Sequence, residues 1–143
     1  MLIQFDPKKY NVVVGTSAVS GFADGTFIVI EANSDTWVKT TGSDGLTIRV
    51  RQNDDTANIT LSLLYSSPSV KILENYRTLD LNTSGGYFNF LAVDSLNPGN
   101  SHISAKAWIR RPPTMTGSKE APVLEYLIDT AEMQFNLTGG VIL

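Results

Sequence analysis

Residues 58–65 read NITLSLLY and alternate between polar and apolar side chains as far as Leu63. The apolar side chains fall on one side and are those of Ile59, Leu61, Leu63 and Tyr65. The polar side chains fall on the other side and are those of Asn58, Thr60 and Ser62. Because successive side chains of a β-strand point to opposite faces, this period of two predicts a strand with one face against a core.

Neighbouring segments with the same period predict two hairpins. Residues 46–52, LTIRVRQ, alternate in the same way, and the turn residues NDD at 53–55 separate them from the first strand. We therefore expect these two strands to pair as an antiparallel hairpin. Residues 11–19 and 26–32 are rich in β-branched side chains and flank the turn sequence SGFADG, which predicts a second hairpin.

The C-terminal part of the chain also shows the pattern of strands. Residues 87–95 and 102–110 flank the turn sequence LNPGN. Residues 123–137 predict a long last strand, but the apolar side chains change sides near Asp129. A bulge or a change of sheet at that position explains the change of parity.

One segment, residues 67–81, breaks the β pattern and predicts a helix over about 67–79. Ser67 is suited to the N-cap and Pro68 to the first helical position. Such a helix packs against a sheet or covers its edge. The predicted fold class is therefore mainly β, an antiparallel β-sandwich or small barrel with one flanking α-helix, in a single domain over residues 1–143. The apolar face of the helix comprises Val70, Leu73 and Tyr76, and Ile72 adjoins it.

Composition restricts the class of protein. The 143 residues are 42% hydrophobic and 17% charged, which is typical of a packed globule. The net charge is −3 and the basic residues are scattered, which disfavours binding of DNA through its phosphates. The absence of cysteine excludes disulfides and thiolate chemistry. The N-terminus lacks the apolar stretch of a signal peptide, so we expect synthesis in the cytoplasm and no membrane association.

The sequence predicts neither an enzyme nor a cofactor or metal site. His102 is the only histidine, and no nearby serine is marked as a nucleophile for it. Residues 43–45 and 53–55 lack the ligand spacing of a calcium loop. A glycosidase pair among Glu125, Asp129 and Glu132 is disfavoured, because charges spaced along one strand are usually solvated.

Trp37 lies in the polar, glycine-containing stretch EANSDTWVKTTGSDGLT at residues 31–47. Either the loop folds back and the indole covers the domain's own core, or the indole packs against another subunit. Aromatic anchors with polar surroundings are typical of interfaces. The composition of the loop leaves both alternatives open.

Four segments together resemble the bacteriophage tail tube protein family of contractile tails. They are GFADGTFI at 21–28, DTWVKTTGSDG at 35–45, TLSLLYSSPS at 60–69 and AKAWIRRPP at 105–113. The resemblance covers nearly the whole chain. It implies a structural virion protein whose hexameric rings stack into the inner tail tube, through which phage DNA passes without specific binding. The implied partners are further copies of the chain, the tail sheath protein, and baseplate and tail terminator proteins.

The resemblance also implies roles for individual residues. An extended loop at about 33–46 would reach the next ring, with inter-subunit contacts at Trp37, Lys39, Thr40 and Asp44. Polar strand faces that lack positive charge would let DNA slide along the lumen. Arg49 and Arg51 are awkward for a lumen unless acidic partners such as Asp54, Asp55 or Glu132 neutralise them. The candidate lumen-facing residues are Asn58, Thr60, Ser62, Glu132 and Gln134.

Two alternatives remain at this stage. The tube protein of a related contractile injection device, such as a tailocin or a type VI secretion system, would share the fold and the stacking. A β-sandwich carbohydrate-binding module would need an exposed aromatic platform, and Trp37 and Trp108 are distant in sequence.

Overall fold

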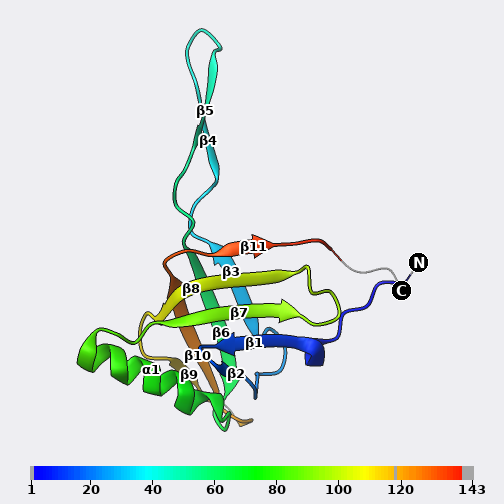
Figure 1. Cartoon of the computed structure of the whole chain (residues 1–143), viewed down its shortest axis with the longest axis vertical. Coiled ribbons are helices and arrows are strands. Elements are labelled where there is room, and N and C mark those ends of the chain that lie inside the picture. The colour runs from blue at the N-terminus through cyan, green and yellow to red at the C-terminus, as the bar shows by residue number, and fades with distance from the viewer. Residues whose placement is uncertain (1, 118, 140–143) are drawn as a thin grey trace.

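The computed structural model describes residues 2–117 and 119–139, so both ends of the domain predicted over residues 1–143 lie outside the described residues. The predicted fold class is confirmed: the protein is mainly β and antiparallel, with α-helix α1 at Ser69–Thr83 and a 3-10 turn η1 at Pro7–Lys9 (Figure 1). The described strands are β1 Tyr10–Val14, β2 Ser17–Ala18, β3 Ile28–Ala32, β4 Trp37–Thr41, β5 Thr47–Arg51, β6 Ala57–Leu64, β7 Phe88–Asp94, β8 Ser101–Ile109, β9 Thr114–Thr116, β10 Val123–Thr130 and β11 Gln134–Asn136.

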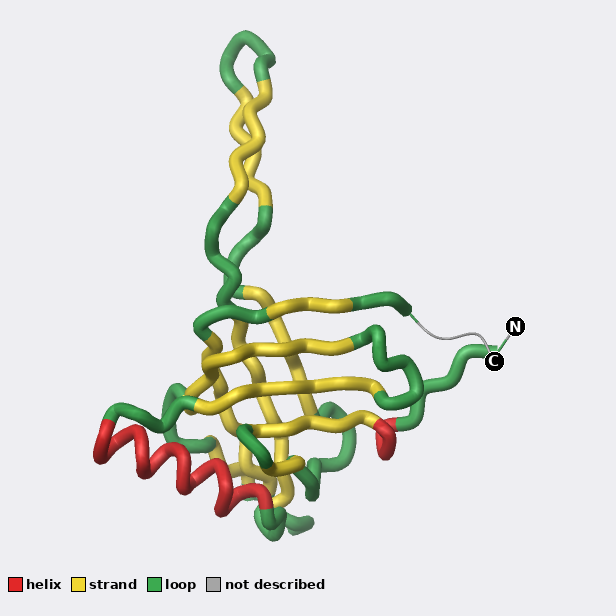
Figure 2. Tube along the Cα trace, viewed as in Figure 1, coloured by secondary structure: helices red, strands yellow, loops and turns green. Residues whose placement is uncertain are grey.

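The described strands other than β4 and β5 form one nine-stranded sheet, with main path β2-β1-β7-β8-β10-β6-β3. The sheet folds over on itself, so that β1, β7, β8 and β11 cross β3, β6 and β10 (Figures 1 and 2). β8 belongs to both layers: it pairs with β7 from Ser101 to Ala107, with β11 near its start and with β10 at its end. The core therefore lies between two layers of one continuous sheet.

β6 confirms the alternation that predicts the fold, because every second residue from Ala57 to Leu63 is fully buried. Tyr65 does not follow this pattern: it is 60% exposed, since the chain turns after the end of β6 at Leu64. Both layers contribute to one apolar cluster. Its largest fully buried side chains are Tyr126, Phe90, Ile59, Leu61, Leu63, Leu73 and Ile128.

α1 begins one residue later than predicted, with Pro68 at the N-cap and Ser69 as the first helical residue. The Ser67 hydroxyl oxygen accepts a hydrogen bond from the Ser69 backbone N–H at 3.2 Å, and Pro68 has helical dihedral angles. The helix continues past the predicted end near residue 79 and stops at Thr83, because the chain turns only at Ser84, which has φ 57°. The last turn of α1, after residue 79, lies outside the segment that the apolar pattern predicted to be helical.

The predicted apolar face of α1 packs on the sheet. Leu73 is fully buried, and the Tyr76 ring lies 4.9 Å from the Phe88 ring, centroid to centroid. The Tyr126 hydroxyl donates a hydrogen bond of 2.8 Å to Glu74. Burial raises the pKa of Tyr126, and so does its hydrogen bond to Glu74.

Both predicted hairpins of the N-terminal half are wrong. β5 pairs with β4 instead of β6, because β3 and β10 occupy the two edges of β6. β1 turns directly into β2 and pairs on its other side with β7, whereas β3 pairs with β6. β3 and β10 thus take the place expected for β5 beside β6. β7 takes the place expected for β3 beside β1. These partners are all distant in sequence.

The C-terminal predictions are confirmed. β7 and β8 flank the turn at residues 96–100 and pair with each other. The predicted last strand changes partner after Thr130: β10 pairs with β6, whereas β11 pairs with β8. The change of parity therefore marks a change of layer.

We predict that Leu61→Ala lowers the free energy of unfolding by about 2–5 kcal/mol, because it leaves a cavity in the core. The matched control is Leu81→Ala on the exposed side of α1, where the side chain is 74% exposed. This variant should change stability by less than about 0.5 kcal/mol. Urea unfolding below the concentration of assembly measures both, and equal destabilisation by the two would contradict the described core.

Candidate inter-subunit surface

The segment predicted as an extended loop at about 33–46 is part of a longer projecting hairpin. Among the described strands, β4 and β5 pair only with each other, and they extend away from the layered body (Figures 1 and 2). Every residue from 35 to 51 is exposed. The hairpin therefore makes no contribution to the core of its own chain.

The two faces of the hairpin differ in chemistry. Residues directly opposite each other on antiparallel strands share a face. One face is basic and aromatic and comprises Trp37, Lys39, Thr41, Thr47, Arg49 and Arg51. The other face is mostly apolar and comprises Val38, Thr40, Ile48 and Val50, all of them exposed.

Trp37 lies at the base of the basic face and is 45% exposed. The guanidinium carbon of Arg49 lies 3.8 Å from the centre of the Trp37 ring, which is the geometry of a cation–π contact. The alternative in which the indole covers the domain's own core is therefore wrong, because the whole hairpin stands clear of the core. The contact ties β4 to β5 and stiffens the hairpin.

The four predicted contact residues occupy different parts of the hairpin. Trp37 and Lys39 lie on the basic face, Thr40 lies on the apolar face, and Asp44 lies in the turn at the end. The Asp44 carboxylate accepts a hydrogen bond of 3.1 Å from the Leu46 backbone N–H. Gly45 has φ 87°, a conformation that favours glycine. Asp44 thus has a local role in shaping the turn.

A carboxylate fastens the base of the hairpin to the body. Asp54 accepts hydrogen bonds of 2.6 Å from the hydroxyls of Ser34 and Thr56, and one of 3.0 Å from the Thr56 backbone N–H. These bonds, from Ser34 first and then from Thr56, hold the pKa of Asp54 below its ordinary value of 3.8. The network joins the segment that precedes β4 to the segment that follows β5.

The expected acidic partners of Arg49 and Arg51 are not in place. Among the described residues, neither arginine makes an ion pair with Asp54, Asp55 or Glu132. Arg49 covers Trp37 instead, and both arginines lie on the hairpin away from the sheet that carries β6. The difficulty they pose for a lumen formed by the sheet therefore disappears.

Three candidate lumen residues share the outer face of β6. Asn58, Thr60 and Ser62 are half-buried between the neighbouring strands β3 and β10. Arg110 donates a hydrogen bond of 2.7 Å to the Asn58 side chain and pairs with the Asp129 carboxylate, its Nε lying 2.9 Å from Oδ2. The positive charge on this face is thereby neutralised.

The other two candidates lie elsewhere. Gln134 lies on β11 opposite Ile103 of β8, and Glu132 lies in the turn that precedes β11. β8 and β11 belong to the layer that crosses β6 (Figure 1). The structure therefore does not bring these two residues together with the polar face of β6.

The residues considered for catalysis form no common site. Burial lowers the pKa of His102, whose ring packs edge-on against Phe135 with 5.2 Å between centroids. Asp129 is paired with Arg110, whereas Glu125 and Glu132 are exposed. Within residues 2–117 and 119–139, no group of three or more potential metal ligands gathers. No helix in that part of the chain has the length and apolarity needed to cross a membrane.

The sequence alone did not predict an uncovered apolar face on the hairpin. Leu46, Ile48 and Val50 alternate with polar residues, and this pattern predicts a face that packs on the chain's own core. In the structure these side chains are uncovered. Period-two alternation shows that one face avoids water, but it does not show whether the covering surface belongs to the same chain.

Solved structures share this fold. The anti-feeding prophage cap, described as its tube terminating cap, matches with a TM-score of 0.70 and 12% identity over 96% of this chain and 94% of that chain. The sheath/tube terminator of an extracellular contractile injection system matches with a TM-score of 0.62 and 15% identity, over 92% and 96%. The tail of a gene transfer agent particle, with C6 symmetry, matches with a TM-score of 0.63 and 14% identity, over 94% and 100%.

These likenesses define the class of fold, which is that of tube and terminator subunits. No curated protein matches the chain in sequence. The family model of the bacteriophage PhiTE tail tube protein matches residues 11–138, so the chain belongs to this tail tube family. The predicted resemblance is confirmed, and the protein is a structural tail component rather than an enzyme.

We predict that Asp54→Ala loosens the base of the hairpin. Backbone hydrogen exchange in β4 and β5 should become several-fold faster, with little change in the core strands. Asp55→Ala is the matched control and should leave exchange in the hairpin unchanged. Faster exchange in the core and the hairpin alike would contradict a local role for Asp54.

The same network predicts a dependence on pH. Because the pKa of Asp54 is lower in the folded protein, its ionised form stabilises the hairpin base above the ordinary value of 3.8. This stabilisation is lost as the pH falls through the lower, folded pKa. Hydrogen exchange in the hairpin should therefore accelerate selectively below about pH 4, and Asp54→Ala should abolish that selectivity.

Proposed function

We propose that copies of this chain form hexameric rings and that the rings stack into the inner tube of a phage tail. The tube would conduct phage DNA during ejection. The observation that carries the proposal is the projecting β4–β5 hairpin, which has an apolar face and no strand partner outside itself within residues 2–117 and 119–139. Membership of the tail tube family supports it, and the C6 symmetry stated for the similar gene transfer agent tail supports six subunits per ring.

The hairpin is suited to the contact between rings. A contact between neighbouring rings needs an element that extends beyond the body, and five-residue strands at about 3.4 Å per residue give about 17 Å of reach. Exposed apolar side chains on such an element are unusual for a protein that remains a monomer. We therefore assign ring-to-ring contacts to the hairpin, including Trp37, Lys39, Thr40 and Asp44.

An edge strand is suited to contacts within a ring. β3 lies at the end of the main sheet path and pairs only with β6. An unpaired strand edge can add a strand from another chain through backbone hydrogen bonds. Pairing of this edge with a neighbouring copy would join the β3-β6-β10 layers of adjacent subunits around the ring.

The outer face of that layer is our candidate for the lumen. It presents Asn58, Thr60 and Ser62, and Glu31 lies opposite Asn58 on β3. This face mixes polar side chains with Val29 and Leu127, which both lie opposite Thr60, and it has no excess of positive charge, so DNA would slide along it without being held. Glu132 and Gln134 lie on the crossing layer, and a lumen formed by β6 would not include them.

The expected partners follow from the assembly. A sheath around the tube, a terminator at one end and a baseplate at the other would each contact this subunit. The protein would be made in the host cytoplasm and would function in the virion.

A second function has support from the structural comparisons. Three of the similar structures come from an anti-feeding prophage and an extracellular contractile injection system. A tube in such a device would have the same subunit contacts and a different cargo. Genes that neighbour the coding sequence distinguish the two, because capsid genes accompany a phage tail.

Negative-stain electron microscopy of the purified chain tests the proposal. We expect rings or stacked tubes with a central channel, in a proportion that rises with protein concentration. A uniform monomer at every concentration, also after addition of preformed tail tubes as seeds, would overturn it.

We predict that Trp37→Ala leaves the monomer folded and weakens polymerisation. The substitution removes the contact with Arg49, so assembly must order a looser hairpin. Tyr87→Ala is the matched control, because Tyr87 is an exposed aromatic residue of the body with Lys106 at 5.3 Å from its ring centre. Electron micrographs should show shortened or absent tubes for Trp37→Ala only, and tubes of normal length would remove the role of Trp37.

A further inference from the structure

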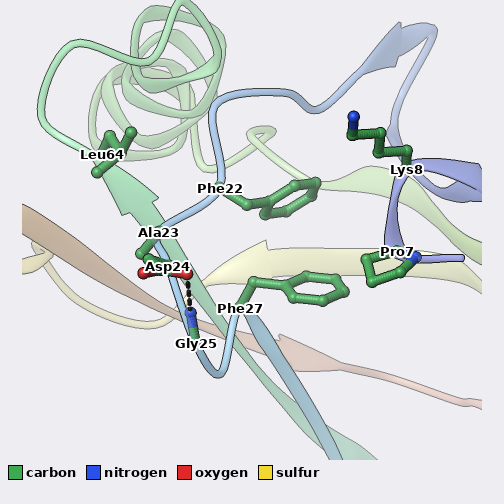
Figure 3. A pocket seen from close by; sticks show the side chains of 8 residues that line it. All are labelled: Pro7, Lys8, Phe22, Ala23, Asp24, Gly25, Phe27 and Leu64. Atoms are coloured by element: carbon green, nitrogen blue, oxygen red, sulfur yellow. Dashed lines mark hydrogen bonds between the residues drawn. The ribbon is translucent and has the colours of Figure 1, made fainter.

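An open pocket with aromatic walls lies at one end of the body (Figure 3). Its volume is about 610 Å³. The rings of Phe22 and Phe27 lie side by side in it, 5.0 Å apart between centroids. Phe27 in turn packs edge-on against Tyr10, with 6.0 Å between centroids. The remaining lining residues are Pro7, Lys8, Ala23, Asp24, Gly25 and Leu64.

This pocket lies at the opposite end of the body from the hairpin. In the register of β3 and β6, Ala32 pairs with Ala57 at the end from which the hairpin extends. Phe27 precedes β3 and Leu64 ends β6, so both lie at the other end of the same two strands. The protein therefore has an uncovered apolar projection at one end and an open apolar pocket at the other.

The apolar side chains of the hairpin continue to its end. Leu46 lies next to the closing turn and is 64% exposed, and Ile48 follows on the apolar face of β5. Neither contacts the core cluster of its own chain. Leu46, just before β5, and Ile48, within β5, are therefore the apolar side chains of this arm that lie nearest to the hairpin turn.

Charge favours the association of the hairpin with the body of another copy. Residues 37–51 contain three basic residues and one acidic residue, a net charge of +2. The whole chain has a net charge of −3, so the rest of it carries −5. Opposite charges on two surfaces attract them and speed their encounter, while apolar contacts fix the position. The pocket itself has one charge of each sign at its rim, from Lys8 and Asp24.

A projection that fits a pocket elsewhere on the same molecule produces head-to-tail association, which continues from copy to copy. We infer that the pocket formed by Phe22, Phe27 and Leu64 receives Leu46 and Ile48 from the hairpin of a second copy. This inference rests on the proposed function, because it gives the stacked rings their receiving site. It also makes the stack polar, with hairpins at one end and open pockets at the other.

A second apolar depression competes as the receiving site. It lies on the broad outer face of β1, β7 and β8 and is lined by Val13, Leu91 and Ile103. A copy displaced along the direction of the hairpin meets the end of the body rather than this broad face (Figure 1). The end pocket is therefore the better placed of the two.

Paired cysteines test the inference, since the chain has no cysteine of its own. The variant Leu46→Cys/Asp24→Cys places one thiol beside the hairpin turn and the other at the pocket rim. The matched control, Leu46→Cys/Asn89→Cys, places the second thiol at the competing depression. A disulfide requires the two Cα atoms to approach within about 7 Å, so cross-linking reports the contact directly. Both variants and the two single Leu46→Cys and Asp24→Cys variants are oxidised under assembly conditions and separated by non-reducing electrophoresis.

We expect a ladder of species larger than a dimer for the Leu46→Cys/Asp24→Cys variant. Their fraction should exceed that of the control by about tenfold or more, because the interface holds the two thiols at a high effective concentration. Each single variant should give dimers at most. Reduction should collapse the ladder to the monomer.

The outcomes separate this inference from the function on which it rests. Tubes in micrographs together with a ladder from the Asn89 control, or with no ladder from either pair, would overturn the pocket as receiving site and leave stacking intact. An absence of tubes together with an absence of ladders would overturn the stacking proposal and the inference with it. If all variants remain monomeric, unchanged thermal unfolding shows that misfolding is not the cause of the missing assembly.

Discussion

Both edges of β6 are occupied along its length, and this constraint determines the rest of the structure. β3 pairs with one edge and β10 with the other, while every second side chain enters the core. The segment between β3 and β6 therefore cannot pair with β6. Its two strands form backbone hydrogen bonds with each other instead, as the β4–β5 hairpin. The Asp54 network at its base then holds it away from the body.

The same constraint gives the subunit two different ends. The hairpin leaves the body where β3 ends and β6 begins, and the aromatic pocket lies where β6 ends. The hairpin exposes apolar side chains on a projection, and the pocket exposes them in a hollow. This exposure costs free energy in an isolated monomer, and burying both surfaces against each other in a stack would be favourable. Family membership and the shared fold agree with this arrangement, since both describe proteins of tubes and terminators. The proposed assembly would thus use two ends that the strand order creates.

The sequence predicted the features that depend on local pattern and missed those that depend on distant pairing. The alternation at residues 58–63, the single helix after Pro68 and the change of layer after Asp129 are all visible in short segments. The partners of β1, β3 and β5 are not, because adjacent strands with a turn between them pair only when no better partner exists. The candidate contact residues of the hairpin, such as Trp37, were predicted through a family resemblance. The apolar face with Ile48 and Val50 was instead assigned to the core. The aromatic pocket is lined by residues from three separate segments, 7–8, 22–27 and 64, and no local sequence pattern connects these segments.

We propose that the hairpin joins successive subunits and does not stabilise its own subunit. A chain in which residues 35–53 are replaced by a short Asn-Gly turn tests it most directly, by electron microscopy beside the full-length chain at equal concentration. We expect the shortened chain to keep the thermal unfolding of the body and to form separate rings or monomers, whereas the full-length chain forms stacked tubes. Tubes of equal length from both chains would contradict the account.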